Sequence, residues 1–446
     1  MRVSALKYLN LAFVVARFAL VLALLLLTLN WRTPLFASWR DTALTALIVL
    51  PLAVIAIEII VVRRAAGRSR ALRLIGGSNL ALAVIVLCAT AAIDIQFRYQ
   101  RHAVLAADPR ELEALGRHLL IGYRDEATLR ILIEHRAIAG VYLSARNVEG
   151  KTAATIRKDV QSLQDMRRAQ GLDPLWIATD QEGGTVSRLS PPLTRLPPLA
   201  EIIALHRDHA EQRLAVAQYA SRQGRELASI GVNLNFAPVV DLNHGVVNPD
   251  DRLTRIASRA ISDDPAVVTE VAGLYCATLM MTGVHCTLKH FPGLGRVYGD
   301  THTVSAKLDA RSDELEDTDW VPFRQLMSES GAFTMLGHAR LTAVDKDHPA
   351  SFSDAVVHSL LRESWKQDGI LVTDDFSMGA VTLSPEGAAG GAVEALNAGV
   401  DLILVSYDPD QYFPVMYALL QAKRDGRLRL GALEQSVARL HRAASR

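Results

Sequence analysis

The stretch VHCTLKHFPGLGRVYGDTH, residues 284–302, contains the pattern from which the fold is predicted. Its first part, residues 284–288, is a short apolar run of strand length, and the basic pair Lys289 and His290 follows directly. A glycine-rich loop comes next and carries Asp300 two residues before His302. An apolar run that ends in polar side chains is typical of a buried strand in an α/β protein, where functional residues gather at the carboxyl ends of the strands.

The same arrangement recurs along the rest of the chain. Further strand-like runs lie at residues 119–121, 139–143, 175–179, 234–238, 333–336, 370–373 and 402–405. Helical stretches separate them, such as residues 153–168, where Ile156, Val160 and Leu163 recur at helical spacing. Strands that alternate with helices indicate parallel pairing through crossover connections. The predicted fold class is therefore α/β, with a closed, TIM-like (β/α)8 barrel as the natural architecture for about 340 residues.

A barrel places its catalytic residues at the carboxyl ends of its strands. Candidate polar residues follow four of the runs: Asp180 after LWIAT, Lys289 and His290 after VHCTL, His338 after FTMLG, and Asp374 after ILVT. Because the runs are located from apolar residues alone, this placement of polar side chains supports the barrel independently.

The first hundred residues differ in composition from the rest. Long apolar stretches lie at residues 8–31, 42–62 and 74–93, and the charged residues inside them are Arg17 and Glu58. Each stretch has about 20 residues or more, enough for a helix to cross roughly 30 Å of hydrocarbon. The sequence predicts a membrane anchor with about three transmembrane helices in residues 1–101 and a catalytic domain in residues 105–446. A cleaved signal peptide is the competing interpretation of the first stretch, but it leaves the other two unexplained.

Basic residues predict how this anchor is oriented. The connection between the second and third stretches contains Arg63, Arg64, Arg68, Arg70 and Arg73, whereas the first connection contains only Arg32 and Arg40. Loops rich in arginine and lysine stay on the cytoplasmic side of a membrane. We therefore expect a multi-pass protein of a bacterial inner (plasma) membrane, with the residues after Ile95 on the outer, periplasmic face.

The remaining composition excludes several classes of partner and site. The formal net charge of +1 provides no overall field for binding nucleic acid. No histidine or cysteine cluster has the spacing of metal ligands, so no metal and no cofactor are expected. The cysteines Cys88, Cys276 and Cys286 are too few for a disulfide framework. Buried thiols are favoured over a bond between Cys276 and Cys286, which stays open.

A second fragment, LVTDDFSMGA at residues 371–380, supplies candidate catalytic groups. A glycosidase needs one group that attacks the anomeric carbon and another that moves a proton on the leaving oxygen. Asp374 is suited to the attack, and His302, oriented by Asp300, is suited to the proton transfer. The neighbouring Asp375 has a structural alternative, since one carboxylate of such a pair can cap the next helix.

In these motifs the chain resembles the family 3 glycoside hydrolases, specifically the β-N-acetylhexosaminidases that cut N-acetylglucosamine from cell-wall fragments. In that branch a KH(F/I)PG run precedes a D-(S/T)-H triplet on a mobile loop, and the first Asp of a (S/T)D-(D/A) pair is the nucleophile. The likeness spans roughly residues 115–445. It includes ATDQEGGTVSR at 178–188, NFAPVVDLN at 235–243, SRAIS at 258–262, PASFS at 349–353 and ALNAGVDLILV at 395–405.

The resemblance implies a role for each matching residue. Asp374 would be the nucleophile, and His302 with Asp300 would be the acid/base pair. Substrate contacts would come from Asp180, Arg188, Arg259, Lys289 and His290. The cations Lys289, Arg188 and Arg259 are expected to hold down the pKa of Asp374. One departure is Leu294, where the family run KHFPG(H/N)G has a polar residue, and it is expected to affect loop packing or leaving-group preference.

The predicted function is that of a retaining exo-glycosidase, which hydrolyses non-reducing terminal β-N-acetylglucosamine from peptidoglycan-derived saccharides. A β-glucosidase, a β-xylosidase or a glycoside phosphorylase on the same barrel is an alternative. The D-T-H triplet argues against the first two, and phosphate dependence would reveal the third. A non-catalytic, membrane-tethered sugar-binding sensor is a further alternative, although a sensor has no need of a nucleophile.

Overall fold

The computed structural model describes residues 2–64 and 70–445, so Arg68 of the predicted cytoplasmic loop lies outside the described residues. The chain divides into two compact units, Met1–His102 and Ala103–Arg446.

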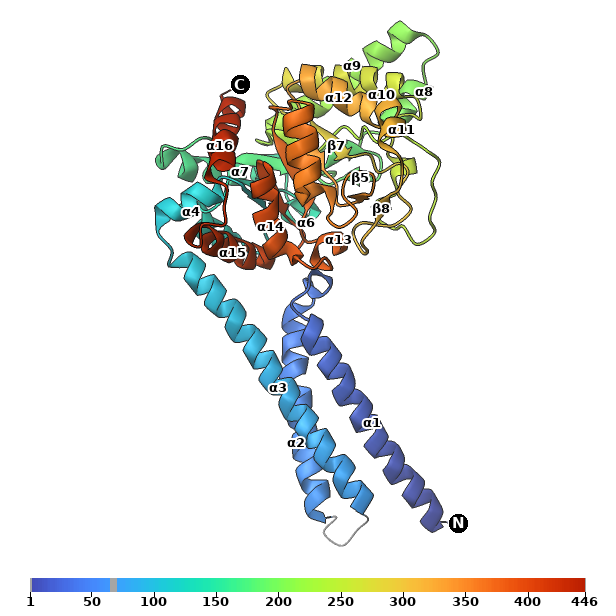
Figure 1. The fold of residues 1–446 in the computed structure, drawn as a ribbon, viewed down its shortest axis with the longest axis vertical. Helices are drawn as coiled ribbons and strands as arrows, with labels where there is room; N and C mark the ends of the chain where they lie inside the picture. Colours follow the sequence, from blue (N-terminus) through green and yellow to red (C-terminus); the bar gives the residue numbers. More distant parts are fainter. Residues whose placement is uncertain (1, 65–69, 446) are drawn as a thin grey trace. The chain divides into compact units, whose positions relative to one another are not determined.

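Three long helices make up the first unit (Figure 1). They are α1 (Arg2–Asn30), α2 (Arg40–Arg64) and α3 (Arg70–Leu105), with a short 3₁₀ turn at Pro34–Phe36. Their facing sides bury an apolar cluster that includes Val21, Leu24, Leu47, Val54, Ala83 and Val86. Among the described residues, the segments Ala12–Asn30, Arg40–Val61 and Leu74–Leu105 are long and apolar enough to cross a membrane. The prediction of three long apolar helices is confirmed at the level of length and composition.

The described residues of the second unit form an eight-stranded parallel sheet. Its strands are β1 (Leu119–Ile121), β2 (Gly140–Tyr142), β3 (Trp176–Thr179), β6 (Leu234–Asn235), β7 (Thr287–Phe291), β9 (Phe333–Leu336), β11 (Leu371–Asp375) and β12 (Leu402–Val405). The hydrogen-bonded order is β6-β3-β2-β1-β12-β11-β9-β7. The first and last strands in sequence are therefore neighbours, with Leu120 paired to Leu404.

The two ends of this order, β6 and β7, come together and nearly close the sheet into a barrel. Parallel bridges join Leu234 to His285 and Val239 to Lys289. Backbone hydrogen bonds run from the Asn235 N–H to the His285 carbonyl (2.8 Å) and from the Thr287 N–H to the Ala237 carbonyl (2.8 Å). The order around the barrel follows the order along the chain, as the alternation of strands and helices predicts.

Helices lie around the outside of the strands (Figure 1). The helices of this unit are α4 (Pro109–Gly116), α5 (Glu126–Glu134), α6 (Ala145–Val148), α7 (Ala153–Ala169), α8 (Leu199–Ala204), α9 (His209–Ser229), α10 (Pro265–Met280), α11 (Ser312–Asp317), α12 (Trp320–Glu329), a π-helix (Ala355–Ser364), α13 (Gly379–Thr382), α14 (Gly387–Ala398), α15 (Tyr412–Arg424) and α16 (Leu430–Ala444). The 3₁₀ turns are Ile256–Ser258, Ala350–Phe352 and Pro409–Gln411. Short strand pairs β4 (Gln181–Gly183) with β5 (Val186–Ser187), and β8 (Lys307–Leu308) with β10 (Arg340–Leu341), lie outside the barrel sheet.

Local signals in the sequence start and stop several of these helices. The side chains of Asp125, Asp208 and Asp264 accept hydrogen bonds from N–H groups in the first turns of α5, α9 and α10. Gly399, with a left-handed φ of 102°, follows the last residue of α14, and its N–H bonds back to the carbonyls of Ala395 and Leu396.

The barrel interior is filled by alternate residues of the strands. Trp176 with Ala178, Phe333 with Met335, and Leu402 with Leu404 belong to one buried apolar cluster. Leu440 of α16 packs against the same cluster.

A buried carboxylate at the start of β12 fastens α16 to the barrel. Oδ1 of Asp401 accepts a hydrogen bond from Arg439 Nε (2.8 Å). Oδ2 accepts from Arg362 Nη2 (2.6 Å) and from the Leu371 N–H (2.8 Å). Because the two guanidinium groups come from the π-helix and from α16, this one side chain joins two outer helices to two neighbouring strands.

Several expectations from the sequence are wrong in detail. The strand expected at residues 370–373 is observed at Leu371–Asp375, so Asp374 lies within β11 and not after it. The strand expected at residues 284–288 is observed at Thr287–Phe291, so Lys289 and His290 lie within β7 and not after it. A disulfide joins Cys276 of α10 to Cys286, and free buried thiols were the favoured expectation. The chain turns sharply after α10, at Gly283 (φ 81°), and enters β7, which brings the two Cα atoms within 5.4 Å. Cys88 is free.

Candidate active site

The predicted site residues lie at or beyond the carboxyl ends of the barrel strands. Asp374 is the fourth residue of β11, and Asp180 follows β3. Lys289 and His290 are the third and fourth residues of β7. The remaining predicted residues lie on loops: Arg188 after β5, Arg259 after the 3₁₀ turn Ile256–Ser258, and Asp300 and His302 after β7. The fold therefore brings these residues to one end of the barrel.

The neighbouring carboxylates Asp374 and Asp375 have different surroundings. Asp375 accepts hydrogen bonds from the Ser377 N–H (2.9 Å), the Ser406 N–H (3.0 Å), the Ser406 hydroxyl (2.6 Å) and the Tyr407 N–H (2.7 Å). Among the described residues, Asp374 accepts one, from the Asp375 N–H to its Oδ1 (2.8 Å). Four donors occupy the acceptor capacity of Asp375, which ties β11 to the end of β12. Asp374 retains capacity for a ligand.

Histidines keep the carboxyl of Asp374 acidic. Burial of this carboxyl raises its pKa, whereas His290, His338 and His302 lower it, and the net pKa lies below the ordinary value. Lys289, Arg188 and Arg259, which the sequence analysis expected to supply this effect, are not among its leading causes.

Lys289 and Arg259 are held by two carboxylates, Asp180 and Glu182. Lys289 Nζ lies 2.6 Å from Asp180 Oδ1 and 2.6 Å from Glu182 Oε1. Arg259 donates to both oxygens of Glu182, from Nε (2.9 Å) and from Nη2 (2.7 Å). Burial lowers the pKa of Lys289, but the two carboxylates raise it above its usual value. The ammonium group therefore stays charged although Lys289 is only 2% exposed.

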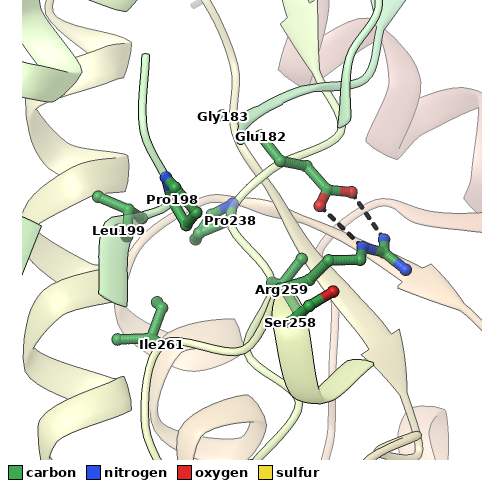
Figure 2. Close-up of a pocket in the computed structure, with 9 residues that line it drawn as sticks. Glu182, Gly183, Pro198, Leu199, Pro238, Ser258, Arg259 and Ile261 are labelled. Carbon is green, nitrogen blue, oxygen red and sulfur yellow. Dashed lines mark hydrogen bonds and ion pairs between the residues drawn. The ribbon is translucent and has the colours of Figure 1, made fainter. Parts of the chain in front are cut away.

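Glu182 was not among the predicted site residues. Figure 2 shows its carboxylate pointing at the guanidinium of Arg259, at one end of a small cavity whose other walls include Pro198, Leu199, Pro238 and Ile261. The two partners lie 77 residues apart in the chain. The sequence signal was present, because Glu182 belongs to the motif ATDQEGGTVSR.

His290 is held by a second carboxylate that the sequence analysis did not single out, Asp241. The His290 Nδ1 lies 2.7 Å from Asp241 Oδ2, and the backbone N–H of His290 also donates to this carboxylate (3.1 Å). The Nδ1–H of His290 donates to this carboxylate, and Nε2 of the same ring lies 3.4 Å from Arg259 Nη2. The Leu294 N–H donates to Asp241 as well (2.7 Å). The Leu294 side chain is 2% exposed, which accounts for an apolar residue at this position.

Asp300 and His302 form the expected pair. The His302 Nδ1 lies 2.9 Å from Asp300 Oδ1, and the His302 N–H donates to the same oxygen (3.0 Å). Thr254, which the sequence analysis missed, donates its hydroxyl proton to Asp300 Oδ1 (2.9 Å). Burial raises the pKa of Asp300, but hydrogen bonds from His302 and Thr254 lower it to about 2. Asp300 is therefore ionised at neutral pH and orients the Nδ1–H tautomer of His302.

The loop that carries this pair is bonded to the segment after the Asp374 strand. The Gly379 N–H donates to the His302 carbonyl (2.8 Å), and the Ala380 N–H donates to the Thr301 carbonyl (3.1 Å). A Cβ atom on Gly379 would lie 2.6 Å from the backbone of Thr303, so this close approach requires glycine.

Two more side chains support the site. The Tyr142 hydroxyl donates to Asp180 Oδ2 (2.6 Å). His338, buried after β9, places Nε2 3.1 Å from the Asp375 carbonyl and Nδ1 2.7 Å from the Ser351 hydroxyl. A carbonyl only accepts, so His338 Nε2 carries a proton and Nδ1 accepts from Ser351. Burial lowers the pKa of His338 and outweighs the opposing effect of Asp374, which favours the neutral ring.

Comparisons with known proteins show the family of the chain. Residues 110–443 match the family described as Glycosyl hydrolase family 3 N terminal domain. A β-hexosaminidase of Stenotrophomonas maltophilia (strain R551-3) is 36% identical over 277 residues, which are 62% of this chain and 78% of that protein. The β-hexosaminidase LpqI of Mycobacterium tuberculosis is 32% identical over 334 residues, which are 74% of this chain and 81% of that protein.

A solved structure has the same fold. The family 3 β-N-acetylglucosaminidase from Paenibacillus sp. str. FPU-7 superposes with a TM-score of 0.67 and 29% identity over 75% of this chain. The chain spans 62% of the length of that protein, which is less than two thirds. The family match over most of the chain, together with the barrel and the relatives above, shows that the chain belongs to glycoside hydrolase family 3, in the branch that contains the β-hexosaminidases.

Proposed function

We propose that the barrel hydrolyses non-reducing terminal β-N-acetylglucosamine from saccharides, as a retaining β-N-acetylhexosaminidase. The observation that carries the proposal is the contrast between Asp374 and Asp375. The Asp374 carboxylate has a lowered pKa, is half-buried at the carboxyl end of its strand and has acceptor capacity left for a ligand, whereas Asp375 is fully bonded to backbone and hydroxyl groups. The names of the matched relatives, which are β-hexosaminidases, favour N-acetylglucosamine over glucose or xylose as the sugar.

The reaction would proceed in two displacements. Asp374 attacks the anomeric carbon while the bond from that carbon to the leaving oxygen breaks, and His302 transfers its Nε2 proton to this oxygen. The product is a glycosyl ester on Asp374. In the second step His302 removes a proton from water, the water oxygen attacks the anomeric carbon, and the Asp374 carboxylate leaves. Two inversions at one carbon retain the β configuration.

The Asp300–His302 pair supports this division of roles. An ionised Asp300 at 2.9 Å fixes Nδ1 as the protonated nitrogen, so the proton that transfers is carried by Nε2 of the imidazolium. The side chain of His302 is 34% exposed, and Asp300 is 4% exposed. The histidine is therefore accessible to a leaving group and to water, while its partner is shielded from both.

The group of charged residues around Lys289 would bind the sugar. Asp180 can accept hydrogen bonds from sugar hydroxyls, and Lys289, His290, Arg188 and Arg259 can donate to hydroxyls and to the acetamido oxygen. Each of the two cations at the base of the group, Lys289 and Arg259, is already held by a carboxylate, so their positions are fixed before a ligand enters. No step of the proposed reaction requires a metal or a cofactor.

We also propose that residues 1–101 anchor the catalytic domain, residues 105–446, to the outer face of a bacterial inner membrane. The arginine-rich connection between α2 and α3 supports a cytoplasmic position for that loop. The Cys276–Cys286 disulfide independently supports an oxidising compartment for the barrel. At this location the accessible saccharides would derive from peptidoglycan.

The proposed activity is tested with the full chain in detergent. Chromogenic β-N-acetylglucosaminide and β-glucoside are compared, each with and without inorganic phosphate, with Asp374→Ala as the blank. Release of free N-acetylglucosamine, independent of phosphate, is the expected result. Preference for the glucoside would reassign the sugar, sugar phosphate as the product would reassign the reaction to phosphorolysis, and binding without turnover would favour a sensor.

A further inference from the structure

A group of polar side chains lies inside the otherwise apolar three-helix unit. Each of the three helices contributes one residue: Arg17 from α1, Glu58 from α2 and Asn79 from α3. Arg17 Nε donates to Glu58 Oε1 (2.7 Å), and Asn79 Nδ2 donates to the same oxygen (2.8 Å). Glu58 and Asn79 are fully buried, and the Arg17 side chain is 16% exposed. We call these three residues the polar triad.

The polar triad lies within the segments that are apolar enough to span a membrane. A single charge within a transmembrane helix is strongly unfavourable, and such residues turn inward and pair with one another. Arg17 and Glu58 cancel each other's charge across the interface between α1 and α2. Without its partner, each helix would hold an unpaired charge in hydrocarbon, which has a higher free energy than the ion pair.

The hydrogen bonding of Glu58 leaves it dependent on these two partners. Both bonds go to Oε1, while Glu58 Oε2 and Asn79 Oδ1 are buried and have no partner among the described residues. No third donor in that part of the structure would therefore compensate for the loss of Arg17.

A second polar contact joins α1 to α3. The hydroxyls of Thr28 and Thr90, both buried, lie 3.2 Å apart. Lipid supplies no hydrophobic force between helices, so their association depends on close packing and on polar contacts such as these.

We propose that the polar triad makes stable insertion of α1 depend on α2, because Glu58 neutralises Arg17, so that the three helices enter and remain in the membrane as one interlocked unit. This inference rests on the proposed membrane anchor. The helices are then an assembled bundle with an internal ion pair, in contrast to three tethers that insert independently.

The test measures whether α1 stays packed on α3 in membranes that contain the full chain. Thr28→Cys and Thr90→Cys are introduced together with Cys88→Ala, and a protease site replaces residues 65–69 between α2 and α3. Membranes are oxidised for a series of times and then cleaved. An N-terminal tag that migrates with the barrel fragment on a non-reducing gel reports the α1–α3 cross-link, and reduction must release it.

The variants form a double-mutant cycle on this parent. Arg17→Leu and Glu58→Leu each leave one unpaired charge, and each should slow cross-linking about tenfold or more. The double variant Arg17→Leu/Glu58→Leu removes both charges, and it should cross-link within about twofold of the parent, since apolar pairs replace buried ion pairs well. Arg98→Leu is the control, because Arg98 is 72% exposed and lies outside the polar triad, and it should have no effect.

Two results would overturn the inference: single variants that cross-link as fast as the parent, or a double variant as slow as the single ones. Alkaline carbonate extraction of the same membranes tests the proposed anchor separately from the dependence of α1 on α2. A parent protein that is extracted as a soluble protein refutes the anchor itself. A parent that stays in the membrane, with cross-linking insensitive to Arg17 and Glu58, refutes only the dependence of α1 on α2.

Discussion

The backbone N–H of Asp375 lies 2.8 Å from Oδ1 of Asp374, so the peptide that links the two carboxylates also holds one of them in place. The next carboxylate, Asp375, is itself fixed by Ser406 and Tyr407 at the end of β12. The orientation of Asp374 therefore depends on a strand to which it does not belong. Substitutions at the two positions should have opposite kinds of effect.

Asp374→Ala should abolish turnover and leave folding and sugar binding largely intact, because this carboxylate accepts a single hydrogen bond from the residues that the structure describes. Asp375→Ala should instead lower thermal stability, because four donors would lose their buried acceptor. Melting temperatures and activity of both variants are compared. A mechanism-based fluoro-sugar should label Asp374, and an adduct on Asp375 would contradict the assignment.

His302→Ala should slow substrates with poor leaving groups by roughly 10²–10⁴-fold, because only these need a proton on the departing oxygen. With activated nitrophenyl glycosides, the rate of the first step should fall much less, and the glycosyl ester on Asp374 should accumulate. Asp300→Ala should show the same pattern more mildly. Equal losses on both kinds of substrate would mean that His302 positions the sugar and transfers no proton.

His338 should act by positioning the strand end that carries Asp374. His338→Leu removes the donor to the Asp375 carbonyl and should slow fluoro-sugar labelling of Asp374 by up to about 100-fold, the effect expected from a small displacement of a reacting group. His338→Gln restores an N–H donor at similar reach and should recover most of the rate. A leucine variant that labels at the normal rate would show that His338 only fills space.

His118 should make the barrel less stable as the pH falls from 6.5 to 4. Burial lowers the pKa of this histidine to about 4, while its Nδ1 donates to the Asp401 carbonyl (2.9 Å). Between these pH values the unfolded chain binds a proton that the folded chain does not, so stability decreases with decreasing pH and levels off below 4. The difference between the ordinary pKa of 6.5 and the folded-state pKa of about 4 corresponds to about 3 kcal/mol in the free energy of unfolding.

The measurement is the free energy of unfolding against pH, with His118→Phe and His441→Ala compared in detergent. His441 is 69% exposed and serves as the control. The phenylalanine variant should lose a large part of the slope between pH 6.5 and 4, and the alanine variant should keep it. Parallel curves for the wild type and His118→Phe would show that His118 is not the group responsible.

Alkaline phosphatase fused after Arg101 should be active, because the arginine-rich connection predicts that the chain leaves the membrane on its outer face. The same enzyme fused after Arg64 should be inactive, which provides the matched control. The reverse pattern of activities would place the barrel in the cytoplasm.

Much of the barrel could be predicted because buried parallel strands are continuous apolar runs. The runs at residues 119–121, 333–336 and 402–405 coincide with β1, β9 and β12. The bounds of β7 could not be predicted in the same way, since Lys289 and His290 end an apolar run by residue type. They continue the strand because Asp180, Glu182 and Asp241, from other parts of the barrel, match their charges and hydrogen bonds.

The candidate site was only partly predictable, because some of its residues are held by partners from distant parts of the chain. Asp300 and His302 are two residues apart, so their pairing can be inferred from sequence. Thr254 bonds to Asp300 from 46 residues away, and Cys276 reaches Cys286 only through the turn after α10. Such partners are defined by closure of the barrel and leave no local pattern.

The pairing of β1 with β12 and the attachment of α16 through Asp401 have a consequence for biosynthesis. The strand that completes the sheet, β12, and the helix that supplies Arg439 both follow Asp374, so they leave the ribosome after every residue of the candidate site. Until then, β1 and β11 each present an unpaired edge, which is a site for aggregation and for proteases. A chain that stopped before β12 would contain the whole candidate site, but its barrel would still be open.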